Sequence, residues 1–300
     1  MCELITKFND VNVEKMNNYI KNNKTINPTL KIEEFTLPDG RLFKVCQDDI
    51  LIAGTKQRIA VKYIKNLLKE NPDIKYIMYS GMSNGYGIVA TAYAAYKLNI
   101  KSLLFICQIH GMTREQVISS RQLSTIHALG GTVYLCNDYK KAAIKKWETY
   151  YDINHIPKKD HFMLPMGLND ENDSGSKILL KQLKSAIKNT EISLNKNKKR
   201  FWLVMGVGGL LHTLYALFPN AEFFVFIVSK GRYLEQSVTW CKNHNIHILN
   251  VFKLNKKYNL KREKYYNSTK NYDDLIWPYL LEYGKSGDYI WNVSSDTIPD

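Results

Sequence analysis

Apolar and polar residues change along the chain in blocks that predict strands and helices in turn. Short apolar runs at 74–79, 102–108 and 132–136 have the length and composition of buried strands. The segments at 59–70 and 85–98 space their apolar residues three and four apart, as one face of a helix does. Strands and helices that alternate with short connections are typical of a parallel sheet covered by helices.

A second series of alternating elements follows a looser stretch at 152–176, which is rich in Pro, Gly, Asn and Asp. The remaining predicted elements are helices 115–129, 139–150, 177–188, 210–217 and 233–243, and strands 201–205, 222–228, 246–252 and 289–293. A turn at 38–40 should join two short strands near the amino terminus. We therefore expect two α/β halves, with ligands bound beyond the carboxyl ends of the strands.

Composition excludes some classes of protein. The 300 residues are 45% hydrophobic and 12% aromatic, which excludes a disordered chain. The formal charge of +14 would permit binding to nucleic acid or to anionic membranes. Only seven of the 42 cations are Arg, and the basic residues are scattered in short groups. This favours a solvated, lysine-rich surface over a nucleic-acid interface.

Cysteine usage and the amino terminus bear on the compartment. The five cysteines are odd in number and widely spaced, and no CxxC occurs, which opposes a disulfide framework and favours a reducing compartment. His244 and His247 are three residues apart, but no third ligand is evident, so we expect no metal site. No start resembling a signal peptide and no apolar run of about 18 residues is present. We expect a cytoplasmic protein that does not engage a membrane.

Three segments carry candidate chemistry. Gly206-Val207-Gly208-Gly209 joins an apolar strand to a helix, where glycines and free N–H groups can hold an anion. A tight structural turn would use the same glycines, so both interpretations stay open. Lys56 lies in a short polar turn before a helix, where a lysine could form a Schiff base or simply be solvated. The small residues of 80–87 suggest close approach of a flat ligand.

Taken together, these segments resemble a known family. GTKQR at 54–58, SGMSNGYG at 80–87, FMLPMG at 162–167, MGVGG at 205–209 and a last strand running into Ser294 occur in the order of the fold-type II pyridoxal-phosphate enzymes. The chain is most similar to the aminocyclopropane-carboxylate deaminase and D-cysteine desulfhydrase branch. That branch carries N-K-x-R-K, Q-S-N, I-P-x-G-G and G-x-G-G segments.

The resemblance implies a fold and a cofactor, pyridoxal 5′-phosphate. The expected fold is α/β, with two three-layer parallel-sheet domains and a cofactor cleft between them. The larger domain would comprise 1–65 and 152–300, and the smaller 66–151. Members of the family are commonly dimers, so a homodimer is expected by analogy.

The resemblance also implies roles for single residues. Lys56 would form the internal aldimine and move protons at the substrate α-carbon. Asn84 would hydrogen-bond the cofactor's ring oxygen and, with Ser83, bind the substrate carboxylate. Ser294 would meet the pyridine nitrogen. The residues that would bind the phosphate are Gly206, Val207, Gly208 and Gly209.

Several positions depart from the family pattern. Gly85 follows the asparagine where a polar residue is common, Leu168 replaces a glycine, and Leu210 replaces a phosphate-binding hydroxyl residue. The aromatic residue over the cofactor is assigned to Tyr279, with Trp277 as the other candidate.

The predicted function is a lyase or deaminase that acts on a small amino acid by Cα deprotonation or elimination. Two alternatives remain open: a catalytically degenerate protein of this fold, and a basic α/β protein that binds nucleic acid.

Overall fold

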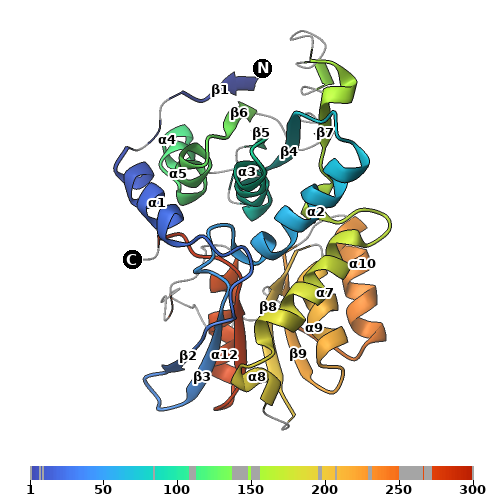
Figure 1. The fold of residues 1–300 in the computed structure, drawn as a ribbon. Helices are drawn as coiled ribbons and strands as arrows, with labels where there is room; N and C mark the ends of the chain where they lie inside the picture. The colour runs from blue at the N-terminus through green and yellow to red at the C-terminus, as the bar shows by residue number, and fades with distance from the viewer. Residues whose placement is uncertain are drawn as a thin grey trace. The chain divides into compact units, whose positions relative to one another are not determined.

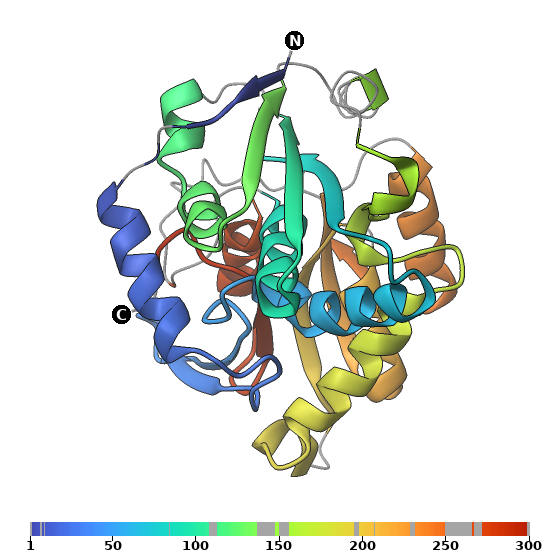
Figure 2. The same cartoon turned by 45° about the horizontal axis from the view of Figure 1, so that its top comes forward.

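A computed structural model describes residues 2–6, 8, 10–83, 85–107, 113–136, 148–149, 156–194, 198–206, 208–228, 232–249, 266 and 272–298. The chain forms two compact units, drawn in Figure 1 and, turned by 45°, in Figure 2. Unit 1 comprises residues 1–27, 52–178 and 296–300, and unit 2 comprises 28–51 and 179–295. The expected domain boundaries at 65 and 151 differ from this division, which assigns 1–27, 52–65 and 152–178 to unit 1.

Unit 1 is built on a five-stranded sheet of order β1-β6-β5-β4-β7. Its strands are β1 (Cys2–Leu4), β4 (Tyr76–Met82), β5 (Lys101–Cys107), β6 (Thr132–Cys136) and β7 (His161–Met163). All pairs are parallel except β1 with β6. The strand β5 is buried from Ser102 to Cys107 and β4 from Ile77 to Ser80, as the predicted apolar runs require.

The helices of unit 1 pack around α3, which covers β4 and β5. Both α2 and α5 contact α3, and α1 contacts α5. These helices are α1 (Asp10–Asn22), α2 (Gln57–Glu70), α3 (Tyr86–Leu98), α4 (Arg114–Ile118) and α5 (Arg121–Ala128); three short 3-10 turns are η1 (Gly54–Lys56), η2 (Lys158–Asp160) and η3 (Met166–Leu168). The central position of α3 explains why its residues from Tyr86 to Ala95 are all buried.

Unit 2 is built on a six-stranded sheet of order β10-β9-β8-β11-β3-β2. Its strands are β2 (Ile32–Thr36), β3 (Leu42–Gln47), β8 (Arg200–Met205), β9 (Glu222–Ile227), β10 (His247–Leu249) and β11 (Tyr289–Asn292). Only β2 and β3 pair in antiparallel fashion, as the hairpin that the turn at 38–40 predicts. Two sheets dominated by parallel pairs confirm the predicted α/β class.

The helices of unit 2 lie between its strands along the chain, as expected of a parallel sheet. They are α8 (Glu191–Leu194), α9 (Gly209–Leu217), α10 (Arg232–Asn243), α12 (Trp277–Tyr283) and the 3-10 turn η4 (Asp273–Ile276), while α7 (Ser174–Ile187) begins in unit 1 and ends in unit 2. Large aromatic side chains, Trp202 and Trp277 among them, fill the core between the sheet and α12.

Two predictions about elements need correction. The single helix expected at 115–129 is two helices, because Ser120 interrupts it: the Ser120 hydroxyl accepts the N–H of Leu123 and starts α5 as its N-cap. The strand β7 was missed, because three residues are too few for a periodic signal, yet β7 pairs with β4. The helix expected at 139–150 lies almost wholly outside the described residues.

The cysteines also differ from expectation. Cys136 is disulfide-bonded, whereas Cys46, Cys107 and Cys241 are free and buried. The antiparallel register of β1 and β6 places Cys2 opposite Cys136. Spacing along the chain could not reveal this, since 133 residues lie between the two positions.

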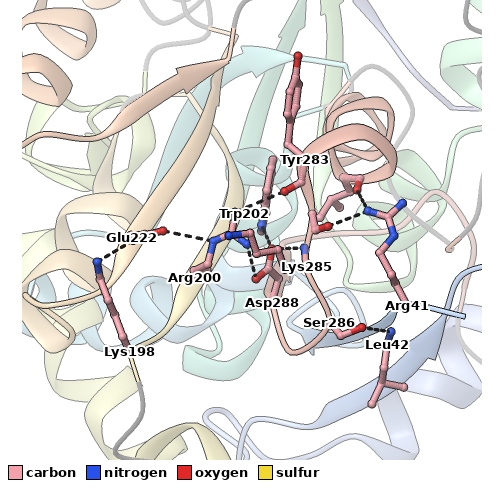
Figure 3. A network of polar contacts seen from close by, with 12 residues as sticks. Arg41, Leu42, Lys198, Arg200, Trp202, Glu222, Tyr283, Lys285, Ser286 and Asp288 are labelled. Carbon is pink, nitrogen blue, oxygen red and sulfur yellow. Dashed lines mark hydrogen bonds and ion pairs between the residues drawn. The ribbon is translucent and has the colours of Figure 1, made fainter.

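A network of polar contacts fastens the segment between α12 and β11 in unit 2 (Figure 3). The buried carboxylate of Asp288 accepts the indole N–H of Trp202 at 2.7 Å, the backbone N–H of Lys285 at 3.0 Å and Arg200 Nη1 at 3.1 Å. Burial raises the pKa of Asp288, and these bonds act against the rise. The network lies just before the amino end of β11. It therefore anchors the end of that strand opposite to the carboxyl end, where the ligand site is predicted.

Arg41 extends the same network to the carboxyl end of α12 (Figure 3). Its guanidinium donates to the carbonyl oxygens of Leu281 at 2.6 Å, Gly284 at 2.7 Å and Leu280 at 3.2 Å. The carboxyl end of a helix leaves carbonyls without intrahelical partners, and Arg41 supplies donors there, while the Leu280 carbonyl also accepts the N–H of Gly284. The side chain of Asp39 holds the guanidinium in place at 2.6 Å.

Candidate functional site

In unit 1, the turn between β4 and α3 holds Ser83. This residue is buried, and its N–H donates to the carbonyl of Cys107 at the end of β5, at 3.0 Å. The N–H of Gly85 donates to the carbonyl of Met82 at 2.9 Å. The turn itself therefore uses these two donors, and a ligand there would meet side chains and the first N–H groups of α3. Asn84 lies outside the described residues.

Some of the small residues around Ser83 have a structural explanation. A Cβ on Gly87 would lie 2.3 Å from Tyr79 Oη, and one on Gly81 would lie 3.1 Å from the Tyr79 ring. The Tyr79 hydroxyl in turn accepts the N–H of Gly167 at 3.2 Å. Gly81 and Gly87 thus make room for a buried tyrosine, and the close approach of a flat ligand stays a prediction.

The segment 162–167 leads into η3, where the departure at Leu168 can be understood. Leu168 has a φ of 60°, in the left-handed region that favours glycine, yet its side chain is fully buried. Its carbonyl would lie 2.0 Å from a Cβ on Gly175, at the start of α7. The chain here keeps the backbone conformation of a glycine and uses the leucine to fill the core.

Lys56 ends the 3-10 turn η1 immediately before α2, and it is partly exposed between the buried Thr55 and Gln57. The turn begins at Gly54, whose φ of 57° suits glycine. Gln57 fastens it, because its side chain accepts the N–H of Ala53 at 3.3 Å and donates to the carbonyl of Ile26 at 3.2 Å. The lysine therefore sits on an anchored turn.

Three of the candidate segments gather around one helix of unit 1. Both η1, with Lys56, and η3, with Gly167, contact α3, which begins directly after the Ser83 turn. The α3 first turn contains no acidic residue. Its N–H groups and the positive end of its dipole thus remain favourable to a negative group such as a carboxylate.

In unit 2, the glycine turn joins β8 to α9. Gly208 has a φ of 92°, and a Cβ there would lie 2.7 Å from Met205 Cε and 3.0 Å from His212 Nε2. Gly209 begins α9, whose first turn has no acidic residue. A glycine turn that opens directly onto a helix amino terminus is suited to bind phosphate. Val207 lies outside the described residues.

The dipeptide Tyr272–Asp273 links this turn to the end of β11, a parallel neighbour of β8. The N–H of Gly206 interacts with the Tyr272 hydroxyl. Asp273 Oδ2 accepts the backbone N–H groups of Val293 and Ser294, both at 3.1 Å. The glycine turn and the buried Ser294 are thereby tied to the same two residues.

Asp273 is the most strongly perturbed acid of this region. Its side chain is buried, and burial raises its pKa well above the usual range, with the charges of Asp49 and Asp274 adding to the rise. The two N–H groups that it accepts act in the opposite direction. The backbone partners of Asp273 lie 20 and 21 residues further along the chain, so no local motif reveals these contacts.

The structure places Tyr279 in the aromatic core of unit 2. Its ring is 5% exposed and packs edge-on against Phe226, with ring centroids 6.0 Å apart. Trp277, the other candidate, belongs to the same core. Core packing accounts for the burial of both rings without a ligand.

In the described part of the chain, no three His, Cys, Asp or Glu side chains come together as a metal site. No described helix is both long and apolar enough to cross a membrane.

Comparison with solved structures identifies the fold. The chain matches a hydrogen sulfide-producing enzyme from Fusobacterium nucleatum with a TM-score of 0.61 and 16% identity, over 91% of this chain and 96% of that one. The chain has the fold of the fold-type II pyridoxal-phosphate enzymes. A homologue of ACC deaminase matches with a TM-score of 0.63 and 12% identity over 94% and 96% of the two chains.

A third structure with the fold-type II fold is diaminopropionate ammonia lyase from Escherichia coli. It matches with a TM-score of 0.58 and 12% identity, over 98% of this chain and 90% of that one. No family model matches the sequence, and no curated protein matches it. At such low identity the likeness concerns the fold alone.

The residues present fit a pyridoxal-phosphate group. The turn from Gly206 to Gly209 offers a helix amino terminus without an acidic residue to its phosphate. In the same unit, Ser294 and the carboxyl of Asp273 are buried polar groups of the kind that can meet a ring nitrogen. In unit 1 taken by itself, Lys56 is a partly exposed amine of the kind that reacts with an aldehyde.

Proposed function

We propose that the protein binds pyridoxal 5′-phosphate and acts on a small amino acid as a lyase or deaminase. The main support is that, within each unit, the motif segments lie close to one another. Within unit 1, Lys56 and η3 gather around α3. Within unit 2, the glycine turn and Ser294 gather around Tyr272–Asp273. Solved proteins with this fold include an ammonia lyase and a deaminase homologue.

Each residue has a role in this proposal. When bound, the cofactor would supply a conjugated ring that takes up negative charge from the substrate α-carbon. Lys56 Nζ would receive the proton that leaves this carbon. Ser83 and Asn84 would orient the substrate carboxylate at the amino end of α3. Turnover depends on holding that carboxylate, because it fixes which bond at the α-carbon lies ready to break.

The phosphate and ring would be held by groups from unit 2. The N–H groups of Gly208 and Gly209 would bind the phosphate, with Gly206 and Val207 completing the turn. Leu210 provides no hydroxyl there, so we expect weaker phosphate binding than a serine or threonine at this position would give. Ser294 Oγ would meet the ring nitrogen.

A binding protein without turnover is the second candidate. The observation that favours it is the set of departures at Gly85, Leu168 and Leu210, of which Leu210 removes a phosphate-binding hydroxyl. An assay of product release from a panel of small amino acids, on protein with cofactor bound, separates the two candidates. Release from any amino acid supports the enzyme, and none from the whole panel supports the binding protein.

The proposal is tested by titrating purified protein with pyridoxal 5′-phosphate and following absorption. We expect the wild type and Lys62→Ala, a change at an exposed lysine of α2, to develop the same new band. Lys56→Ala should bind without forming that band. A wild type that forms no band would contradict the proposed cofactor, and a band that survives in Lys56→Ala would contradict the role of Lys56.

A further inference from the structure

Asp273 is a buried carboxyl group with one oxygen unused. Its side chain is 2% exposed, and Oδ2 accepts two backbone N–H groups, from Val293 and Ser294. Oδ1 is buried and has no hydrogen-bond partner among the described residues. A buried polar atom without a partner is costly, and native proteins keep such atoms chiefly where a ligand, a water or a function completes them.

The surroundings of Asp273 favour its neutral form. The ionisable groups that act on it are Asp49, in the segment after β3, and Asp274, beside it in the chain. Tyr272 is the third titratable neighbour, and burial, followed by the charge of Asp273, raises its pKa. Ser294, at the end of β11, contributes only its N–H. Since Asp49 and Asp274 are themselves acids, ionisation of Asp273 would add a third negative charge nearby.

We infer that Asp273 carries a proton on Oδ1 and donates it, as a hydrogen bond, to the ring nitrogen of a pyridine-type ligand held beside Ser294. This inference rests on the proposed function and extends it. The geometry places this carboxyl beside Ser294, because Oδ2 accepts the Ser294 N–H and leaves Oδ1 without a partner among the described residues. A serine hydroxyl alone leaves a ring nitrogen neutral, whereas a carboxyl shares its proton and makes the ring a stronger acceptor of negative charge.

The test compares two ligands that differ only at the ring nitrogen. Pyridoxal 5′-phosphate and its 1-deaza analogue, in which a C–H replaces the nitrogen, are titrated into the wild type, Asp273→Asn and Asp274→Asn. We expect the wild type to prefer the nitrogen-containing ligand by about tenfold or more, as for a hydrogen bond with ionic character. Asp273→Asn should lose most of this preference, and Asp274→Asn should keep it.

The outcomes separate this inference from the proposed function. If neither ligand binds the wild type, the proposed function fails and the inference fails with it. If both bind and Asp273→Asn keeps the wild-type preference, only the role of Asp273 is overturned.

A second measurement uses no ligand, and its first step uses only the wild-type protein. An infrared spectrum of the cofactor-free protein at neutral pH should contain the carbonyl band of a neutral carboxylic acid, which Asp273→Asn removes. A wild-type spectrum without that band would show an ionised Asp273 and overturn the inference.

Discussion

Replacing Gly208 by alanine tests whether the glycine turn of unit 2 is as tight as its geometry indicates. Two separate effects should destabilise this variant. The φ of 92° is unfavourable for any residue with a Cβ, at a cost of about 1–2 kcal/mol. The new methyl group would also meet Met205 Cε at 2.7 Å and His212 Nε2 at 3.0 Å. Overpacking of this kind costs about 1–3 kcal/mol.

Gly40 provides a matched control in the same unit. Its φ of 85° is almost the same, but a Cβ there would meet no atom within 4 Å. Gly40→Ala therefore measures the backbone cost alone, reduced by the roughly 0.4–1 kcal/mol that alanine gains by restricting the unfolded chain. We expect Gly40→Ala to lower the free energy of unfolding by about 1 kcal/mol, and Gly208→Ala by about 2–4 kcal/mol.

The assay is urea unfolding of both variants beside the wild type, followed by titration with pyridoxal 5′-phosphate. Gly208→Ala should also weaken cofactor binding, since the turn must shift to accommodate the methyl group, whereas Gly40→Ala should bind as the wild type does. Equal loss of stability in the two variants would refute the steric argument, because it would show that nothing crowds Gly208.

Three further predictions follow from contacts within single units. Gly87→Ala should destabilise unit 1 by about 1–3 kcal/mol, because its methyl group overlaps Tyr79 Oη, and Tyr79→Phe should recover part of this loss in a double-mutant cycle by urea unfolding. Arg41→Ala should cost about 2 kcal/mol in the same assay, because two carbonyls of α12 and that of Gly284 just after it lose a charged donor, and Asp39→Ala should change stability much less. Because the folded-state pKa of Asp273 lies above its unfolded value, its contribution to stability is present at acid pH and is lost as the pH rises through the folded pKa. As the pH rises from 4 to 8, the free energy of unfolding of Asp273→Asn should therefore increase relative to that of the wild type. The increase should be about 1.4 kcal/mol per unit of difference between the folded and unfolded pKa values of Asp273, and parallel pH profiles would contradict this.

Local periodicity predicted the elements whose burial depends on one face. The segment 59–70 became most of α2, and 74–79 became most of β4, because the apolar spacing reports which side chains face the core. The same signal could not detect β7, which is three residues long and held by its pairing with β4. Nor could it detect the break at Ser120, where one hydroxyl decides that a new helix begins.

The candidate site was predictable only where a local motif carries it. The glycine turn at 206–209 follows its strand and precedes its helix as expected, since three adjacent features of the sequence define it. The contribution of Tyr272 and Asp273 depends on contacts with Gly206 and Ser294, which lie far from them along the chain. Only the folded chain brings these residues to neighbouring strand ends.

The most direct test of the central claim is to identify the lysine that holds the cofactor. Wild-type protein with pyridoxal 5′-phosphate is reduced with borohydride, digested, and its labelled peptide sequenced by mass spectrometry. The account predicts a single stable label on Lys56, at the end of η1, although the chain has 35 lysines. A label on another lysine, or labels spread over many exposed lysines, would contradict it.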